Sequence, residues 1–245
     1  MPVARSGPHG RGERRGRIQS HANQSLGHPL RIEHCSPHLR DKGGALINIG
    51  SLESAAALPL HAAYSASKHA VKGLTDALRV ELAESGTPVS VTLVHPPAID
   101  TLFNDHAKSY LPSAPTFPPP VYSPEVVARS ILYACEHPQR DVYIGNSKLF
   151  TRMSQLAPGL TDMLNSHIIY KVLHSGRPDR HRAGNLHNED VGTVPDGTAS
   201  GEYPGRVHKW SFYAYASRHP LIVTTAAAGA LALMAGLKKT RRSGP

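Results

Sequence analysis

Residues 44–68 read GALINIGSLESAAALPLHAAYSASK, and this stretch decides the fold. Its first part, Ala45–Ile49 (ALINI), is a short apolar run typical of a strand buried in a parallel sheet. Ser51 follows at the C-terminal end of this strand, where α/β sheets carry their chemistry. A helix is predicted from Tyr64 to about Ala83, because apolar residues recur there at helical spacing. The members of this apolar stripe are Val71, Leu74, Leu78 and Leu82.

The chain that follows continues the alternation of strands and helices. Val89–Val94 (VSVTLV) predicts a second strand, and a strand, a helix and a second strand make a βαβ unit with parallel strands. The proline-rich stretch Ile99–Tyr122 predicts a long loop, and loops of this length are usually lids, binding loops or disordered segments. A helix over Pro124–Glu136, a strand over Asp141–Ile144 and a helical stretch over Phe150–Tyr170 are expected next. The sequence therefore predicts an α/β fold with helices flanking a parallel sheet.

The polar residues of the opening stretch suit proton transfer to a carbonyl oxygen. Tyr64 and Lys68 are four residues apart on the predicted helix, so their side chains share a face. A phenol with a pKa of about 10 is a poor acid or base at neutral pH, and a neighbouring ammonium is expected to lower that pKa. Ser51 could polarise a substrate oxygen while Tyr64 gives or takes its proton. The alternative for Tyr64 and Lys68 is an ordinary surface pair.

A resemblance to a known family rests on these residues. ALINIGS (residues 45–51), the interval of thirteen residues from Ser51 to Tyr64, and the following YSASKHAVKG resemble the classical short-chain dehydrogenase/reductase family. The resemblance covers about Pro37–Tyr170 and implies a Rossmann-like parallel sheet with flanking helices. It also implies that Ser51, Tyr64 and Lys68 are the catalytic residues, with Lys68 holding the nicotinamide ribose as well.

The same resemblance implies a cofactor and a class of substrate. VHPPAIDT (residues 94–101) is similar to the family segment that lies beside the nicotinamide. NAD or NADP is therefore implied as cofactor, and a small hydrophobic ketone or secondary alcohol as substrate, with Leu102–Tyr122 as its lid. In the family the helix that carries Tyr-x-x-x-Lys commonly lies in a dimer interface, which implies pairing of the chain with itself, as a homodimer, or with a complete relative. The residues implied to contact the cofactor are Asn48, Gly50, Tyr64, Lys68, Pro96, Ile99 and Thr101.

Several features of the family do not occur in this sequence. The T-G-x-x-x-G-x-G turn that holds the cofactor pyrophosphate and the N-A-G segment beside the adenine are both missing. Pro97 stands where the family usually has glycine. We therefore expect a Rossmann-like domain that is truncated at its amino end. The preceding residues 1–36 are then not the family's own sequence. An alternative function is that of a catalytically inactive fragment or pseudoenzyme, which acts through dimerisation or membrane tethering.

The net charge of +9 belongs to the two ends of the chain. Residues 1–40 contain seven arginines against two glutamates, and residues 238–245 contain four basic residues and no acidic one. The stretch between them carries sixteen basic and sixteen acidic side chains. The predicted folded part is therefore neutral and has no field that would attract polyanions, so no nucleic-acid partner is expected.

The first segment of the chain indicates no site of its own. Residues 1–36 show no apolar period and predict a disordered basic arm. Their glycines lack the preceding strand and the following helix that a phosphate-binding loop needs. Four side chains that could bind a metal have irregular spacing that matches no zinc pattern, so no metal site is predicted. They are His28, His34, Cys35 and His38.

Three further segments complete the predicted organisation. Residues 37–173 form the carboxyl-terminal part of the Rossmann-like domain, residues 174–209 a flexible linker, and residues 210–245 an aromatic and apolar helix with a basic tail. Within the last, Leu221–Leu237 is 17 residues without a charge, near the short limit for crossing a bilayer. Aromatic residues before it and KKTRR after it favour a membrane anchor with the basic end cytoplasmic. The alternative is an Ala-rich helix docked on the domain or on a partner. The expected location is cytoplasmic, or membrane-associated with a cytoplasmic catalytic domain.

Overall fold

The fold comes from a computed structural model of the chain. The residues that the structure describes are 39, 42–106, 113–178, 199–201, 203–219, 221 and 223–225. The predicted basic arm, residues 1–36, lies outside the described residues, as does most of the predicted anchor Leu221–Leu237.

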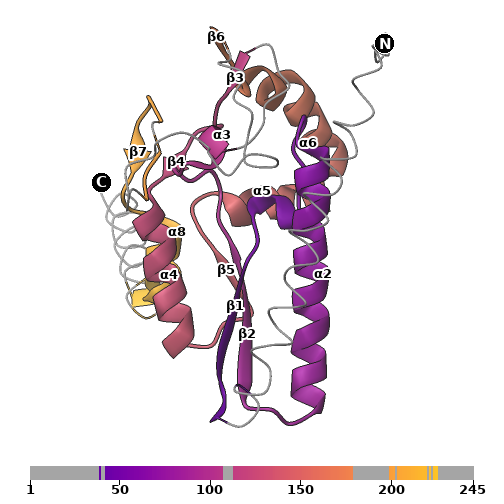
Figure 1. The fold of residues 1–245 in the computed structure, drawn as a ribbon, viewed down its shortest axis with the longest axis vertical. Helices are drawn as coiled ribbons and strands as arrows, with labels where there is room; N and C mark the ends of the chain where they lie inside the picture. The colour runs from indigo at the N-terminus through magenta and orange to yellow at the C-terminus, as the bar shows by residue number, and fades with distance from the viewer. Residues whose placement is uncertain are drawn as a thin grey trace, which may run out of the picture.

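A parallel sheet forms the centre of the molecule (Figure 1). Its strands are β1 (Gly44–Ile49), β2 (Val89–His95) and β5 (Asp141–Tyr143), in the order β1-β2-β5, and both pairings are parallel. β2 is central, and its side chains from Val91 to His95 are all buried. Because a parallel sheet is covered on both faces, its middle strand is apolar along most of its length. The predicted α/β fold with a parallel sheet is confirmed.

The crossover between β1 and β2 is the long helix α2 (Ala62–Glu84). It buries Val71 and Thr75 against the sheet, and Arg79 Nε donates to the carbonyl oxygen of Val91 at 3.1 Å. The helix ends before Gly86, whose φ of 66° lies in the left-handed region that favours glycine. The helix predicted from Tyr64 to about Ala83 is therefore confirmed, with one or two more residues at each end.

Helices cover both faces of the sheet. Figure 1 shows α2 on one side and α4 (Pro124–Glu136) on the other. A short 3₁₀ helix, η1 (Leu52–Ser54), follows β1, while α5 (Ser147–Leu156) and α6 (Pro158–Leu164) follow β5. The buried apolar cluster under α4 consists of Val94, Val126, Ala134, Val142 and Ile144. The chain after α6 continues through η2 (Asn165–Ile169), a stretch of π-helix, and α7 (Tyr170–Val172).

The proline-rich stretch Ile99–Tyr122 contains more regular structure than predicted. Its described parts include α3 (Phe103–His106), β3 (Ser113–Pro115) and β4 (Val121–Tyr122). β3 pairs antiparallel with β6 (His174–Pro178). The sequence shows no periodicity here because the strands are only two to five residues long and their partners are distant in the chain.

Parts of the predicted linker and of the predicted C-terminal helix lie on the domain. β7 (Val207–His208) pairs in parallel with β4, and α8 (Phe212–Arg218) contacts α4 and β5. Ala214 of α8 is only 2% exposed, and Ser211 Oγ accepts hydrogen bonds from the amides of Ala214 and Gly145. Residues 203–218 are thus attached to the sheet domain by pairing, capping and burial.

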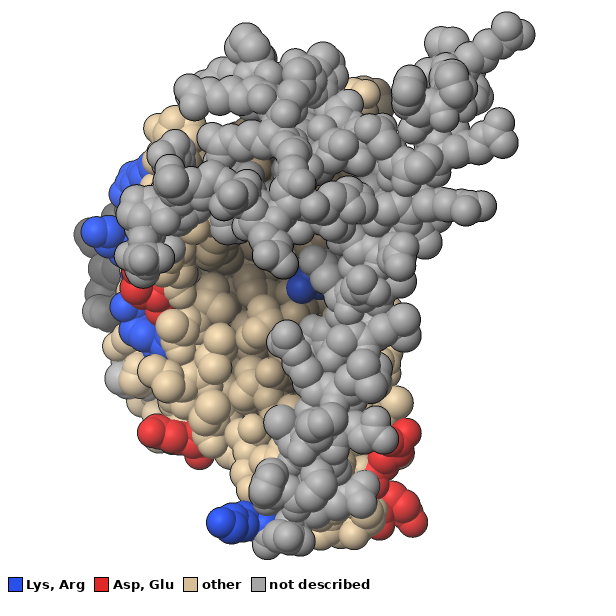
Figure 2. Space-filling model, in the orientation of Figure 1, with Lys and Arg blue, Asp and Glu red and all other residues tan. Residues whose placement is uncertain are grey.

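Two surface features bear on partners. On the face shown in Figure 2, the charged side chains of the described residues lie mainly at the margins, with acidic and basic groups both present. This distribution agrees with the neutral charge balance of the middle of the sequence.

Among the helices of the described part of the chain, none has both the length and the apolar character needed to cross a bilayer.

Candidate active site

The turn after β1 holds Ser51 in place. Ser51 is the N-cap of η1: its Oγ accepts from the amide of Glu53 at 3.1 Å, and its own amide donates to Ser54 Oγ at 3.0 Å. The preceding residue, Gly50, donates its amide to the carbonyl oxygen of Val94 at 2.9 Å. A Cβ on Gly50 would lie 2.6 Å from Ser54 Oγ and 3.0 Å from the carbonyl oxygen of Val94, so a larger residue would displace the Ser54 side chain. The local backbone therefore presents Ser51 at the C-terminal end of the sheet.

Tyr64 reaches Ser51 from the first turn of α2. The Ser51 side chain lies near enough to the Tyr64 phenol to lower its pKa. The Tyr64 ring lies against Phe103, with 5.5 Å between the ring centroids, and His61 stands at its edge at 6.1 Å. Tyr64 is thus held between the end of β1 and the start of α3.

Lys68 lies one turn further along α2 than Tyr64. Its Nζ donates to the carbonyl oxygen of Ile49 at 3.2 Å and lies 5.6 Å from the centroid of the Tyr64 ring. The structure therefore brings Ser51, Tyr64 and Lys68 together at the end of β1, as their spacing predicts.

The pKa of Tyr64 moves in the direction opposite to the one predicted. Burial raises it most, the Ser51 side chain lowers it in part, and the charge of Glu53 adds a smaller rise, so that the pKa is raised to about 12. Burial also lowers the pKa of Lys68, and here the charge of Glu53 acts in the opposite direction to burial. The prediction that Lys68 lowers the pKa of Tyr64 was therefore wrong for this state of the site, because desolvation dominates.

Glu53 is a neighbour of the site that the sequence analysis missed. It is only 4% exposed, and its Oε1 lies 2.9 Å from His61 Nδ1. Its Oε2 accepts from the Ser65 hydroxyl at 2.5 Å. The charge of Glu53 raises the pKa of both Tyr64 and Lys68. The available signal was an acidic residue two positions after Ser51, in a stretch of mostly small and apolar residues.

Of the residues predicted to contact the cofactor, Asn48 and Pro96 are buried in the structure. Asn48 is 4% exposed, and its side-chain amide donates to Thr75 Oγ1 at 2.9 Å, so it joins β1 to α2. Its side chain is therefore used within the fold, and the place of Asn48 to Gly50 beside the cofactor stays a prediction. Pro96 is buried, and its carbonyl oxygen accepts from the amide of Leu52 at 2.8 Å.

The other two predicted contacts, Ile99 and Thr101, flank Asp100, which holds a distant segment of the chain. Asp100 accepts two hydrogen bonds from that segment: its carbonyl oxygen from the Gly201 amide at 3.3 Å, and its Oδ1 from the Tyr203 amide at 3.2 Å. A Cβ on Gly201 would lie 2.5 Å from the carbonyl oxygen of Thr101. Part of the segment predicted to be a linker therefore lies directly on residues predicted to contact the nicotinamide.

In the described part of the chain, no group of three or more His, Cys, Asp or Glu side chains is placed to hold a metal ion.

Comparison with known proteins relates the chain to one family. A sequence model described as short chain dehydrogenase matches residues 26–110, which include Ser51, Tyr64 and Lys68. The uncharacterized oxidoreductase YxnA of Bacillus subtilis (strain 168) is 40% identical over 192 residues, which cover 77% of this chain and 53% of YxnA. A crystal structure of a short-chain dehydrogenase from Burkholderia cenocepacia J2315, in complex with NADP, is 27% identical with a TM-score of 0.51. Residues 26–110 of this chain therefore carry the sequence pattern of the short-chain dehydrogenase family.

The coverage of these family relatives is partial. The similarity to the Burkholderia short-chain dehydrogenase covers 60% of this chain and 57% of that one. The putative oxidoreductase SadH of Mycobacterium tuberculosis (strain CDC 1551 / Oshkosh) is 47% identical over 66 residues, 26% of this chain and 24% of SadH. The chain thus spans about half the length of YxnA. The family match begins at residue 26, whereas the sequence analysis predicted its start at Pro37. The similarity to YxnA covers 192 residues, more than the family model covers.

Proposed function

We propose that this protein is an NAD(P)-dependent oxidoreductase that interconverts a hydrophobic ketone and a secondary alcohol. The observation that carries the proposal is the grouping of Ser51, Tyr64 and Lys68 at the end of β1, with the Ser51 side chain acting on the Tyr64 phenol and the Lys68 ammonium beside the Tyr64 ring. The match to the short-chain dehydrogenase family model supports it, as does the oxidoreductase description of YxnA. The NADP in the Burkholderia relative supports a nicotinamide cofactor.

Ser51 and Tyr64 supply two hydroxyl groups that a substrate oxygen can meet. A hydroxyl both donates and accepts, so each can hold the carbonyl oxygen of a ketone or the hydroxyl of an alcohol. With its pKa raised to about 12, the Tyr64 phenol carries its proton at neutral pH. In this state it holds the proton that the reduction delivers to the substrate oxygen, and the reverse reaction returns the proton to it.

Lys68 fits the position of a group that holds the cofactor. Its ammonium has three donors, and one of them is used on the Ile49 carbonyl oxygen. The other donors could bind the hydroxyls of the nicotinamide ribose. When bound, the nicotinamide would supply or accept the hydride, while the protein positions the substrate and moves the proton.

The surroundings of Tyr64 support an apolar substrate. The ring of Phe103 lies against Tyr64, and Phe103 is 43% exposed, so it offers an apolar surface next to the proposed proton donor. Glu53 lies close enough to affect both Tyr64 and Lys68, but its two oxygens are engaged by His61 and Ser65. A neutral substrate therefore fits the site better than a cation.

The test is reduction of a ketone panel, including acetophenone and cyclohexanone, with NADH or NADPH in separate assays. Consumption of the reduced nicotinamide, with formation of the alcohol, is the expected result. Ser51→Ala is expected to lower kcat on the order of 100-fold, since it removes a donor to the substrate oxygen. Ser217→Ala on α8 serves as the control and should match wild type. The absence of turnover with every ketone, and with the corresponding alcohols and NAD or NADP, would refute the proposal.

A further inference from the structure

We propose that His95 is a positioning residue, which holds the backbone of Ser51 and is itself held by Asp141. This inference rests on the proposed function of Ser51, and it adds a residue that lies outside the group in contact with substrate.

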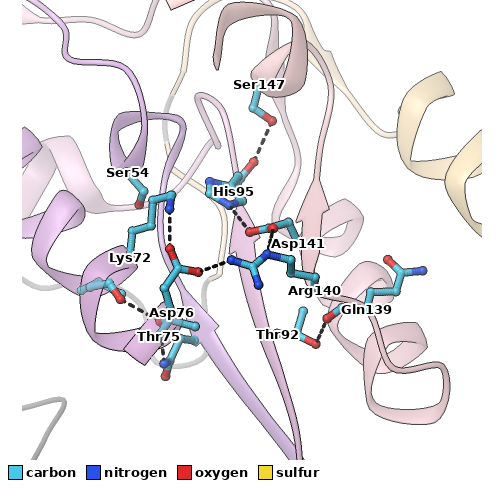
Figure 3. Close-up of polar contacts among 12 residues, drawn as sticks. Ser54, Lys72, Thr75, Asp76, Thr92, His95, Gln139, Arg140, Asp141 and Ser147 are labelled. Carbon is cyan, nitrogen blue, oxygen red and sulfur yellow. Dashed lines mark hydrogen bonds and ion pairs between the residues drawn. The ribbon is translucent and has the colours of Figure 1, made fainter. Parts of the chain in front are cut away.

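His95 ends β2 and is fully buried, with 0% exposure. Its Nε2 lies 3.0 Å from Asp141 Oδ1, and its Nδ1 lies 3.3 Å from the carbonyl oxygen of Ser51. The ring stacks on Tyr143, with the centroids 4.5 Å apart and an angle of 10° between the planes. Figure 3 shows His95 between β2 and Asp141, with the contact to Asp141 drawn. The imidazole therefore spans the gap between β5 and the catalytic turn.

Both partners of the ring are acceptors. A backbone carbonyl oxygen and an ionised carboxylate only accept hydrogen bonds, so both contacts orient a ring nitrogen of His95 toward an acceptor. Burial raises the pKa of Asp141, but the hydrogen bond and charge of His95, with the charges of Arg79 and Arg140, outweigh it and keep that pKa below its usual value. Asp141 is thus a carboxylate that fixes the ring orientation, and the opposite nitrogen is aimed at Ser51.

The carbonyl oxygen of Ser51 is a sensitive point of the catalytic turn. It also accepts from the amide of Ser54 at 3.0 Å, and that bond closes η1. The carbonyl oxygen of His95 accepts in turn from Ser147 Oγ at 2.7 Å, which fixes the end of β2. Release of the Ser51 carbonyl would let η1 shift and would turn the Ser51 hydroxyl away from Tyr64. A small misplacement of a reacting group is enough to reduce the rate strongly.

The support for His95 extends across the sheet to α2. Asp76 on α2 contacts Arg140 Nη2 at 2.9 Å, and Arg140 Nε lies 3.4 Å from Asp141 Oδ2. The same chain of contacts is visible in Figure 3, where Arg140 stands between the two aspartates. The orientation of His95 is therefore set by groups that take no part in the chemistry.

Two substitutions separate the two ends of the His95 ring. In His95→Asn the amide nitrogen takes about the place of Nδ1, so the donor to Ser51 remains while the contact with Asp141 is lost. In His95→Gln the amide nitrogen takes about the place of Nε2, so the contact with Asp141 remains while the donor to Ser51 is lost. Asp141→Asn, which keeps the shape of Asp141 and removes its charge, gives a third variant if one of the first two does not fold.

The experiment compares the variants by amide hydrogen exchange and by kinetics. His95→Gln should speed exchange of the Ser54 amide and lower kcat on the order of 10- to 100-fold, with KM changed less. His95→Asn should stay near wild type in both measurements, and Asp141→Asn should fall between them. Equal losses in His95→Asn and His95→Gln, or losses that follow their melting temperatures alone, would overturn the positioning role.

The exchange measurement keeps this inference distinct from the proposed function. If wild type turns over no ketone or alcohol, the oxidoreductase proposal fails, and the contrast in Ser54 exchange alone decides whether His95 holds the turn. If wild type is active and the contrast is missing, only the role of His95 fails.

Discussion

The Lys68 ammonium donates a hydrogen bond to the carbonyl oxygen of Ile49, 3.2 Å away at the end of β1. This contact joins α2 to the strand that precedes Ser51, and it places the Lys68 ammonium 5.6 Å from the centroid of the Tyr64 ring. Burial lowers the pKa of Lys68, so the fold disfavours the charge that it retains there. A charged group that burial disfavours in this way is typical of a residue kept for function rather than for stability.

Lys68→Met should therefore separate activity from stability. The lost hydrogen bond to Ile49 is offset by relief of the desolvation that lowers the pKa of Lys68, so the melting temperature should stay at or above that of wild type. Affinity for NADPH should fall about tenfold or more, because charged donors to the cofactor are lost. Binding is measured by nicotinamide fluorescence, with Lys171→Met as an exposed control on α7. A large drop in melting temperature with unchanged affinity would show a structural lysine instead.

Glu53→Gln should shift the pH dependence of alcohol oxidation to lower pH. Oxidation needs deprotonated Tyr64, so its rate rises as the pH approaches the Tyr64 pKa of about 12. The charge of Glu53 raises that pKa, and its removal should lower it. The measurement is kcat/KM against pH, with Asp162→Asn on α6 as the control. A shift to higher pH, or none, would mean that Glu53 does not act on Tyr64.

The contact between Asp100 and the 199–205 segment gives a matched pair of variants. Asp100→Ala removes the oxygen that accepts from the Tyr203 amide, whereas Asp100→Asn keeps an oxygen in the same place. Exchange of the Tyr203 amide should become faster in Asp100→Ala and change little in Asp100→Asn. Equal protection in both variants would show that other contacts hold the segment in place.

Asp76 should contribute to stability through three cationic partners. Its oxygens lie 2.5 Å from Lys72, 2.6 Å from Arg79 and 2.9 Å from Arg140. Asp76→Asn should lower the free energy of unfolding by about 1–3 kcal/mol at neutral pH, by urea denaturation. Burial raises the Asp76 pKa, but Lys72, Arg79 and Arg140 lower it more.

The sign of the pH effect follows from that lowered pKa. Asp76 stabilises the folded state above the ordinary aspartate pKa of about 4, and this stabilisation is lost as the pH falls through the lower pKa of the folded state. The difference between wild type and Asp76→Asn should therefore shrink in acid. Glu84→Gln at the end of α2 is the control, and a difference that stays constant down to acid pH would contradict the role of Asp76 as a carboxylate.

The sequence predicted the parts of the site that depend on local spacing. The interval of four residues between Tyr64 and Lys68 puts them on one helix face, and the apolar run before Ser51 puts that residue at a strand end. Both features are carried by short segments with clear periodicity, and the structure has them where they were expected.

Features that depend on distant segments could not be predicted in this way. The direction of the Tyr64 pKa shift follows from burial, which no spacing reveals. His95 and Asp141 are 46 residues apart in the chain, and they meet only because β2 and β5 are neighbours. The segment that contains Gly201 and Tyr203 has no apolar period. It contributes its own backbone amides to the contacts with Asp100, and such amides occur in any sequence.

The most direct test of the account is the rate of NADPH-dependent ketone reduction by Tyr64→Phe. This substitution removes only the phenolic oxygen, so the fold and the contact with Phe103 should persist, while the proton donor is lost. The account predicts a fall in kcat of about 100- to 10,000-fold, with an unchanged melting temperature and with Tyr213→Phe on α8 at the wild-type rate. A Tyr64→Phe rate close to that of wild type would contradict it.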